Sequence, residues 1–119
     1  HNANVNIKNI RGTAPLHYAA MNGDTSVMQW LIDLGADTDV KDTDGKSVLH
    51  YAAERSGHAE VIRFLVSLAC DVNSKANDGF TPLHVAADDI EIIKVLLEHG
   101  GDVHARSAKG RTPLFEALR

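Results

Sequence analysis

Histidine is the residue type with the clearest capacity for chemistry in this chain, since it supplies 7 of the 119 residues. Three of them, His17, His50 and His84, recur at a spacing of about 33 residues, which is typical of a repeated structural unit. Imidazole is a common zinc ligand, but zinc ligands lie within about 2 Å of the ion. Equivalent positions on stacked helices are about 8–10 Å apart. We therefore expect no metal site, and no other cofactor.

Carboxylates offer no better case for catalysis. Asp37, Asp71 and Asp102 share one repeat position and are typical of residues that stabilise a turn. Asp88 and Asp89 are adjacent and favour the start of the helix that follows, because a helix N-terminus attracts negative charge. No acid and base pair emerges, and no glycine-rich phosphate loop occurs. We expect a protein without enzyme activity.

The cysteine content bears on the cellular compartment. Cys70 is the only cysteine and lies beside an apolar run, so we expect a buried, unreactive thiol. No disulfide can form within the chain, which fits a reducing compartment, and we expect a cytoplasmic or nuclear protein. No apolar run approaches the ~20 residues of a membrane span, so no membrane association is expected.

The elements that must position these residues are repeats. The segment from Gly12 to Ala20 returns from Gly45 to Ala53 and from Gly79 to Ala87, and a fourth copy starts at Gly110. An apolar run follows each full copy, and then a short turn that contains aspartate. The pattern predicts a short helix, a longer apolar helix and a hairpin in every unit.

The start of each first helix carries a capping signal. Thr81 and Thr112 precede proline, and Ser47 takes the same position, so we expect these hydroxyls to accept from backbone N–H groups. Ala14 removes the cap from the first copy and leaves Thr13 as a substitute. Small Ala-Ala pairs follow in each full copy, which permit neighbouring helices to approach closely.

The second helices carry the main apolar face. Their apolar residues are spaced by three and four, which predicts one broad buried surface that includes Trp30. The predicted core positions are Val27, Met28, Trp30, Leu31, Leu34, Val61, Ile62, Phe64, Leu65, Leu68, Ile92, Ile93, Val95, Leu96 and Leu97. A helix pair of this size cannot cover that face alone, so neighbouring pairs must stack on it.

The repeated Gly-x-Thr-Pro-Leu-His-x-Ala-Ala motif and the Leu-Leu-x-x-Gly-Ala-Asp-Val-Asn tail resemble the ankyrin repeat over essentially the entire chain. The resemblance implies an all-α solenoid of stacked antiparallel helix pairs with projecting hairpin loops. It also implies that the imidazoles of His17, His50 and His84 hydrogen-bond neighbouring turns.

The repeats divide the chain into one ankyrin domain, residues 1–119. We expect a partial repeat at 1–8, repeats at about 9–41, 42–75 and 76–106, and a partial repeat at 107–119. No terminal unit with a polar outer face is visible, so we expect further ankyrin repeats to adjoin both ends of the parent chain and the outer faces to be apolar. Hydrogen exchange should be slowest around residues 62–66 and fastest after Gly110.

Surface recognition is then the expected function, namely binding of another protein through the concave hairpin and first-helix surface. Lys8, Lys41, Lys75 and Arg106 share one repeat position, which the resemblance places on the concave side, and this basic ladder favours an acidic or mixed partner segment. The candidate contact residues are Arg11, Met21, Asn22, Lys41, Thr43, Lys46, Glu54, Arg55, Lys75, Asn77, Phe80, Arg106, Lys109 and Arg111. Neighbouring variable positions are Ile10, Thr13, Asp44, Asp78 and Ala108.

Two other functions stay open. The chain could be a structural or regulatory ankyrin fragment of a larger channel, kinase or effector protein. Nucleic-acid binding by the basic ladder is a distant third, because 12 Lys and Arg against 16 Asp and Glu give a formal net charge of -4.

One modification site follows from the resemblance alone. Leu65 precedes Asn73 within a segment similar to the ankyrin sequence that an iron-dependent asparaginyl hydroxylase recognises. The alternative is an ordinary hairpin asparagine whose side chain holds its loop by hydrogen bonds.

Overall fold

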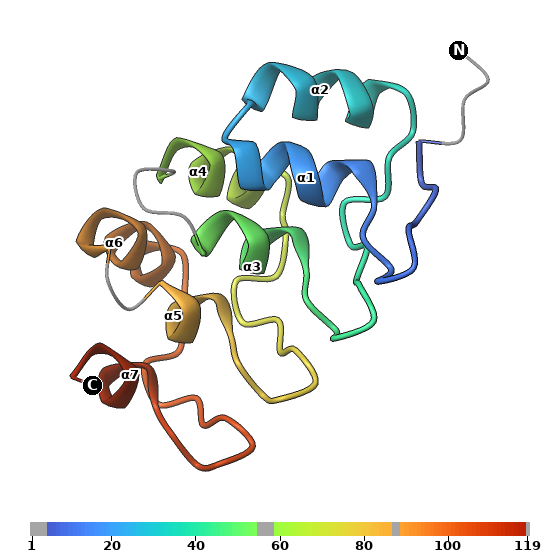
Figure 1. Cartoon of the computed structure of the whole chain (residues 1–119). Coiled ribbons are helices and arrows are strands. Elements are labelled where there is room, and N and C mark those ends of the chain that lie inside the picture. The colour runs from blue at the N-terminus through green and yellow to red at the C-terminus, as the bar shows by residue number, and fades with distance from the viewer. Residues whose placement is uncertain (1–4, 55–58, 87–88, 119) are drawn as a thin grey trace.

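The computed structural model describes residues 5–54, 59–86 and 89–118, and in these ranges the only regular elements are helices (Figure 1). The all-α expectation is confirmed. Helices pair as α1 and α2, α3 and α4, and α5 and α6, and α7 stands after the last pair. Their bounds are α1 Pro15–Asn22, α2 Thr25–Asp33, α3 Val48–Ala53, α4 Ala59–Ser67, α5 Pro82–Val85, α6 Ile90–Glu98 and α7 Pro113–Ala117.

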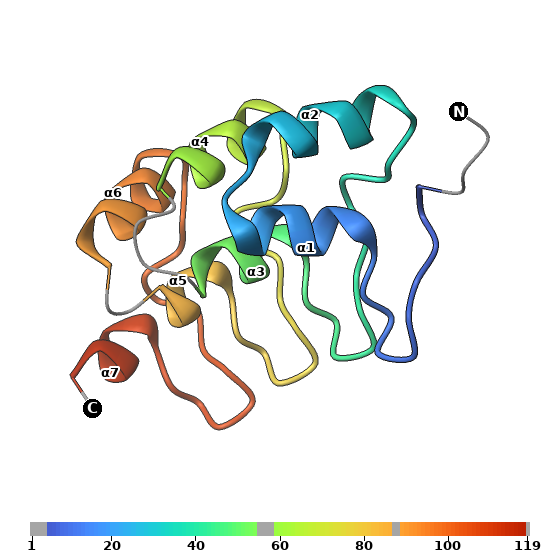
Figure 2. The same ribbon diagram turned by 45° about the horizontal axis from the view of Figure 1, so that its top comes forward.

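The helices form two layers with hairpins projecting from one of them. Helices α1, α3, α5 and α7 pack side by side in the first layer, and α2, α4 and α6 form the second (Figures 1 and 2). The hairpins extend away from the first layer, roughly across its helices (Figure 2). The molecule is elongated along the stack, 45 × 27 × 20 Å, as a solenoid of helix pairs requires.

Helix starts follow the predicted caps only in part. Ser47 Oγ accepts from the backbone N–H of His50 at 3.4 Å, and Thr112 Oγ1 accepts from that of Phe115 at 3.3 Å. Thr81 makes no such cap, although its hydroxyl lies 3.0 Å from Nδ1 of His84, just as the Ser47 hydroxyl lies 2.8 Å from Nδ1 of His50. Thr13 is no substitute cap either, since it hydrogen-bonds the Tyr51 hydroxyl of the next unit at 3.1 Å.

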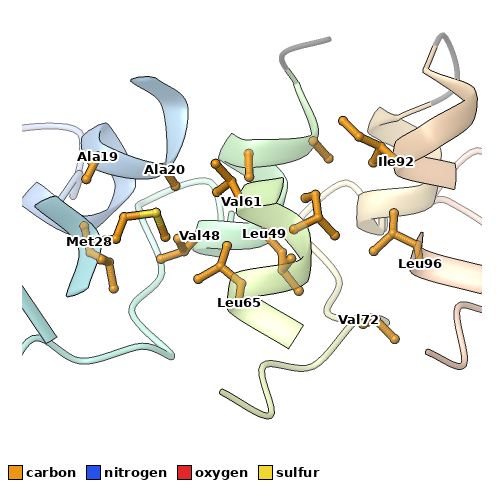
Figure 3. Close-up of a cluster of buried hydrophobic side chains, with 14 of the residues drawn as sticks. Ala19, Ala20, Met28, Val48, Leu49, Val61, Leu65, Val72, Ile92 and Leu96 are labelled. Atoms are coloured by element: carbon orange, nitrogen blue, oxygen red, sulfur yellow. The ribbon is translucent and has the colours of Figure 1, made fainter. Parts of the chain in front are cut away.

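The core runs through the middle of the stack, between the two layers. Figure 3 shows Met28, Leu49, Leu65 and Leu96 as parts of one continuous buried cluster. The small alanines that the structure describes in these pairs are at most 5% exposed, and Ala20 is fully buried, which lets neighbouring first helices approach as predicted. Each repeat therefore contributes to a core that it shares with its neighbours.

Equivalent residues of the second helices differ in how far they are buried. Val61 and Ile92 are 1% and 0% exposed, whereas Val27 at the equivalent position of α2 is 39% exposed. Trp30 is 62% exposed, so its predicted core position is wrong. This face of a second helix is covered by the preceding helix pair, and no described helix pair precedes α2.

Other predicted core positions are also outside the core. Leu34 and Leu97 are exposed at the C-terminal ends of α2 and α6. The prediction treated each apolar run as one face, but only the residues between two layers or two pairs are buried.

Second helices end on left-handed residues. Gly35 and Gly100 have φ values of 99° and 93°, as expected for a helix end, and glycine adopts this conformation without steric penalty. Ala69 holds the same position after α4 with φ 65°, the one non-glycine of the described residues with positive φ. The second unit therefore carries local backbone strain that the first and third lack.

Candidate functional site

The side walls of the candidate site are hairpins that are tied to one another. One backbone hydrogen bond joins each to the next: Thr43 N–H to the Arg11 carbonyl at 3.0 Å, Asn77 N–H to the Asp44 carbonyl at 2.8 Å, and Ala108 N–H to the Asp78 carbonyl at 2.7 Å. The same donor and acceptor positions recur in each joint. The hairpins therefore stack in a fixed register.

Close approach at glycine makes this register possible. Gly79 has φ +82°, and a Cβ built on it would lie 2.7 Å from the backbone nitrogen of Ala108 in the next hairpin. A side chain would therefore force the two hairpins apart. The glycine that begins each repeat motif is a contact residue between hairpins as well as a turn residue.

Each repeated imidazole braces a hairpin against a helix. Nδ1 of His50 accepts from Ser47 N–H at 3.1 Å, so the neutral ring carries its proton on Nε2 and donates it to the Phe80 carbonyl of the next hairpin at 2.7 Å. His17 and His84 repeat the pattern, with Nε2 3.1 Å from the Lys46 carbonyl and 2.8 Å from the Arg111 carbonyl. The structural role expected for these histidines is confirmed.

Burial of these rings changes their acid–base behaviour. Desolvation lowers the pKa of His17 and of His50, and their backbone and charge interactions only partly oppose it. Both rings are fully buried. The neutral form is the one that holds the hairpins.

The surface between the hairpins and the first helices is a groove with two adjoining pockets, which we call the N-terminal and C-terminal groove pockets. Their volumes are about 260 Å³ and about 390 Å³. The N-terminal groove pocket is lined by Arg11, Thr13, Tyr18, Met21, Asp42, Asp44, Lys46, Tyr51 and Glu54. The C-terminal groove pocket is lined by Lys46, His50, Glu54, Ala76, Asp78, Phe80, His84, Val85 and Glu116.

An ion pair separates the two pockets. Lys46 Nζ lies 3.2 Å from Glu54 Oε2, and both residues line both pockets. Burial alone would lower the pKa of Lys46, but the attraction of Glu54 outweighs it and raises that pKa. The pair therefore forms a charged divider across the groove.

The floor of the N-terminal groove pocket is held by a tyrosine. Tyr51 donates its hydroxyl proton to Asp42 Oδ2 at 2.5 Å, and burial and this carboxylate raise the pKa of Tyr51 to about 12. Burial alone would raise the pKa of Asp42, but hydrogen bonds from Tyr51 and from the backbone of Lys46 and Asp44 outweigh it and lower that pKa. Asp42 is therefore ionised at neutral pH.

Five of the predicted contact residues line the groove. These are Arg11, Met21, Lys46, Glu54 and Phe80. Phe80 also packs on the ring of His84, with ring centroids 5.0 Å apart. Phe80 is partly exposed and lies outside the buried core, and its contact with a partner stays a prediction.

Other predicted contact residues have structural roles or other places. Thr43 and Asn77 join hairpins: Thr43 Oγ1 donates to the Arg11 carbonyl at 2.9 Å, and Asn77 Nδ2 to the Thr43 carbonyl at 2.9 Å. Arg111 lies over the Phe115 ring at 4.9 Å. The remaining predicted contacts are an exposed Lys109, an Asn22 that lines an apolar pocket at the α1 end, and Arg55, which lies outside the described residues.

Lys41 of the basic ladder does not line the groove. Lys41 lines a third pocket together with Cys70 and Ser74, on the opposite side of its hairpin from Asp42. Lys8 donates from Nζ to the Lys41 carbonyl at 3.0 Å and so ties two hairpins. Lys75 and Arg106 are exposed at the same repeat position. The concave placement of Lys41 is wrong, because successive side chains of an extended hairpin arm point to opposite sides.

Sequence reasoning missed several groove residues. Tyr18, Asp42 and Tyr51 line the N-terminal groove pocket, and Val85 lines the C-terminal one. The available signal was position, since Tyr18, Tyr51 and Val85 all follow a braced histidine directly. The residue after each such histidine points to the groove.

The remaining chemical candidates have structural roles. Cys70 is half-buried rather than buried as expected, and partial burial raises the pKa of its thiol to about 11, so the thiol stays protonated at neutral pH. Asp71 Oδ1 accepts from Asn73 N–H at 2.9 Å, and Asp37 and Asp102 make the same turn bond. Asp89 caps α6 as predicted; Asp88 lies outside the described residues.

Asn73 is engaged on both sides of its amide. Its Nδ2 donates to the Gly100 carbonyl at 3.0 Å, and its Oδ1 accepts from Asp102 N–H at 2.8 Å. Asn6 makes the equivalent contacts with Gly35 and Asp37. Hydroxylation of Asn73 stays a prediction, and the observed contacts are those of a hairpin asparagine that ties its loop to the next.

The architecture and groove define a class of protein built from stacked helix pairs and hairpins that presents a long lateral surface. A family model described as ankyrin repeats in three copies matches residues 1–76 and 68–119. The chain belongs to the ankyrin repeat family, whose members are in general non-enzymatic modules for protein–protein interaction.

Curated relatives match over short stretches. The chain is similar to the E3 ubiquitin-protein ligase KEG of Arabidopsis thaliana, 37% identical over 43% of this chain and 3% of that protein. It is similar to the putative ankyrin repeat protein FPV244 of Fowlpox virus (strain NVSL), 40% identical over 42% of this chain and 8% of that one. The FYVE zinc finger domain protein UPA1 of Mycosarcoma maydis is 44% identical over 35% of this chain and 3% of its own. The matched stretches thus span a small fraction of each relative.

Two findings concern other kinds of site. Across residues 5–54, 59–86 and 89–118, no group of three His, Cys, Asp or Glu side chains is arranged to hold a metal ion. In the same ranges no helix has the length and apolar character to cross a membrane.

Proposed function

We propose that this chain binds a partner protein through the groove between its hairpins and its first helices, without catalysing a reaction. The observation that carries the proposal is the groove itself, two adjoining pockets whose walls are held in register by repeated hydrogen bonds. A surface that is already ordered loses little conformational entropy on binding. Family membership supports an interaction role of this kind.

The chemistry of the groove supports binding over catalysis. Its most distinctive polar contact, Tyr51 to Asp42, joins a phenol with a raised pKa to a carboxylate with a lowered one. Neither group titrates near neutral pH, where a general acid or base has to exchange a proton. Its imidazoles donate to backbone carbonyls and are occupied. Such a groove recognises a surface and does not transfer protons.

A structural role inside a larger protein is a second candidate, and the apolar end faces favour it. At the α1 end, Tyr18 and Val27 line an apolar pocket of about 580 Å³. At the α7 end, Ile93 and Leu114 line another of about 310 Å³. Apolar surfaces of this kind usually have an occupant in the assembled protein. In this alternative the ends, and not the groove, carry the function.

The two candidates separate in an affinity purification. The chain would be immobilised and its co-purifying proteins quantified by mass spectrometry, beside a groove variant, Met21→Ala with Phe80→Ala, and an end-face variant, Val27→Ala with Leu114→Ala. We expect a specific partner to be lost with the groove variant and kept with the end-face variant. Loss with the end-face variant alone would contradict groove binding.

The basic ladder gives a further control. Reversing Lys41, Lys75 and Arg106 to Glu should leave partner capture unchanged, because Lys41 lines a pocket away from the groove. It should also change the free energy of unfolding by less than about 2 kcal/mol, since exposed charges contribute little to stability. If this variant no longer captures a partner, or no longer binds an immobilised polyanion, binding would instead be assigned to the ladder.

A reducing intracellular compartment is the proposed location.

A further inference from the structure

The charge of the groove differs from that of the basic ladder. Asp42 and Asp44 line the N-terminal groove pocket, and Asp78 lines the C-terminal one. Within the described ranges, none of these three carboxylates takes part in an ion pair; the ion pairs there join Lys46 to Glu54, Arg63 to Glu60 and Glu91, and Lys94 to Glu91. The groove therefore presents negative charge that its own described cations do not pair.

The groove has few basic side chains, and one of them is already in an ion pair. Lys46 is paired with Glu54, so the divider contributes no net charge to either pocket. Arg11 is the other Lys or Arg side chain among the described groove residues. An acidic segment would meet carboxylates that make no ion pair in both pockets and be repelled.

The floor beneath these carboxylates is apolar and aromatic. Tyr18, Met21 and Tyr51 supply it in the N-terminal groove pocket, and Phe80 and Val85 in the C-terminal one. Lysine and arginine combine an aliphatic stem with a cationic head, so they can bury the stem on such a floor while the head meets a carboxylate. Aromatic rings add attraction for a cation above their face.

Repeat geometry sets the distance between the two pockets. Neighbouring first helices lie about 8–10 Å apart, and a polyproline II segment rises about 3.1 Å per residue with three residues per turn. Side chains three residues apart on such a segment point to the same side and are about 9 Å apart, so they can enter adjacent pockets.

We infer that the groove takes a segment of a partner protein in the polyproline II conformation with two Lys or Arg side chains three residues apart, one head beside Asp42 and Asp44 and the other beside Asp78. This inference rests on the proposed function and names the chemistry of the partner. The Lys46 and Glu54 side chains lie between the two bound cations. The inference replaces the acidic partner that the basic ladder suggested.

The test uses short random peptides displayed on phage and selected on the immobilised chain. Selected sequences should be enriched in Lys or Arg pairs three residues apart. Synthetic versions, followed by fluorescence anisotropy, should bind about tenfold or more weakly to the Asp44→Asn, Asp78→Asn variant, because two charge-assisted contacts are lost. Asparagine keeps the oxygen that accepts from Phe80 N–H, so the hairpin is preserved. Binding should also weaken as salt rises from about 0.05 to about 0.5 M.

A matched variant controls for net charge. Asp33→Asn with Glu98→Gln removes the same two charges from exposed positions on α2 and α6, and it should leave peptide affinity unchanged. Equal weakening by both variants would overturn the inference, because it would indicate a nonspecific effect of charge.

The outcomes distinguish the inference from the proposed function. Selection of acidic peptides whose binding is lost with Met21→Ala and Phe80→Ala would overturn the basic partner and leave groove binding standing. Peptides that bind the groove variants as tightly as the unchanged chain would overturn both. Selection of no peptide, or of basic peptides without a preferred spacing, would also overturn the inference.

Discussion

Helices α2 and α4 have the same length and the same repeat positions, yet they differ sharply in burial. Val61 of α4 is 1% exposed and Phe64 is partly buried, whereas their equivalents in α2, Val27 and Trp30, are 39% and 62% exposed. The difference does not come from residue type, since Val61 and Val27 are both valine. It comes from the neighbours, because α4 lies between two described helix pairs and α2 beside one. Burial in a repeat stack is thus a property of position.

The largest expected effect contrasts a buried position of α4 with an exposed position of α2. Ile62→Ala removes a fully buried side chain in the middle of the stack and should lower the free energy of unfolding by about 3 kcal/mol or more. Trp30→Ala should lower it by less than about 1 kcal/mol, because most of that side chain already faces solvent. Urea denaturation followed by circular dichroism measures both.

Hydrogen exchange provides an independent check of the same contrast. Amides of residues 62–66 should exchange most slowly and those after Gly110 fastest. Equal losses for the two alanine variants, or uniform protection along the chain, would mean that the neighbours do not set local stability.

The next effect concerns the joints between hairpins. Gly79→Ala should lower the free energy of unfolding by about 2 to 3 kcal/mol, since it adds a backbone contact to the strain of a positive φ. Gly110→Ala has a similar φ and open space around it, so the loss should be about 1 kcal/mol. Thermal denaturation of the two variants tests this order. A larger loss of stability for Gly110→Ala would contradict the role of Gly79 as a contact between hairpins.

Acid should weaken the braces. The pKa values of His17 and His50 are lowered in the folded chain, so the unfolded chain binds more protons below about pH 6.5. Their contribution to stability is present above that pH and is lost as the pH falls towards their folded values. Urea midpoints should therefore decrease from about pH 7 to about pH 5.

A surface histidine serves as the control for this pH dependence. His104 is exposed, and its replacement by glutamine should leave the change in midpoint with pH intact. A midpoint that holds steady or increases on acidification would show that the neutral rings do not stabilise the stack.

The smallest effect compares the ends of α2 and α4. Ala69→Gly should raise the free energy of unfolding by about 0.5 to 1 kcal/mol, because glycine accepts the positive φ without strain. Gly35→Ala at the equivalent position of α2 should lower it by a similar amount, since no atom lies near the added Cβ. Chemical denaturation measures the change in the free energy of unfolding for both variants. A loss of stability for Ala69→Gly would contradict backbone strain at Ala69.

The sequence predicted the repeated features well and the singular ones poorly. The roles of His50, Asp71 and Gly100 follow from their recurrence, because one set of hydrogen bonds operates at every repeat. Trp30 was misplaced because periodicity reports which residues share a face and does not report whether anything covers it. Lys41 was placed on the wrong side because resemblance located its position in the hairpin but not the direction of its side chain.

Thr81 shows a third limit. Its hydroxyl contacts the ring of His84 without a hydrogen bond from the backbone, whereas Ser47 at the equivalent position makes both contacts. Residue types alone do not determine which of these local hydrogen bonds form.

The identical joint between successive hairpins has a consequence for the length of the groove. Each joint uses the same donor and acceptor positions. A unit such as residues 42–75 therefore carries both the N–H group that joins it to the preceding hairpin and the carbonyl that joins it to the next. A tandem copy of that unit could be spliced between residues 75 and 76 without a new kind of contact. The spliced chain would have one more pocket with an Asp42, an Asp44 and a Lys46 of its own, so recognition length is a modular quantity that gene duplication can extend.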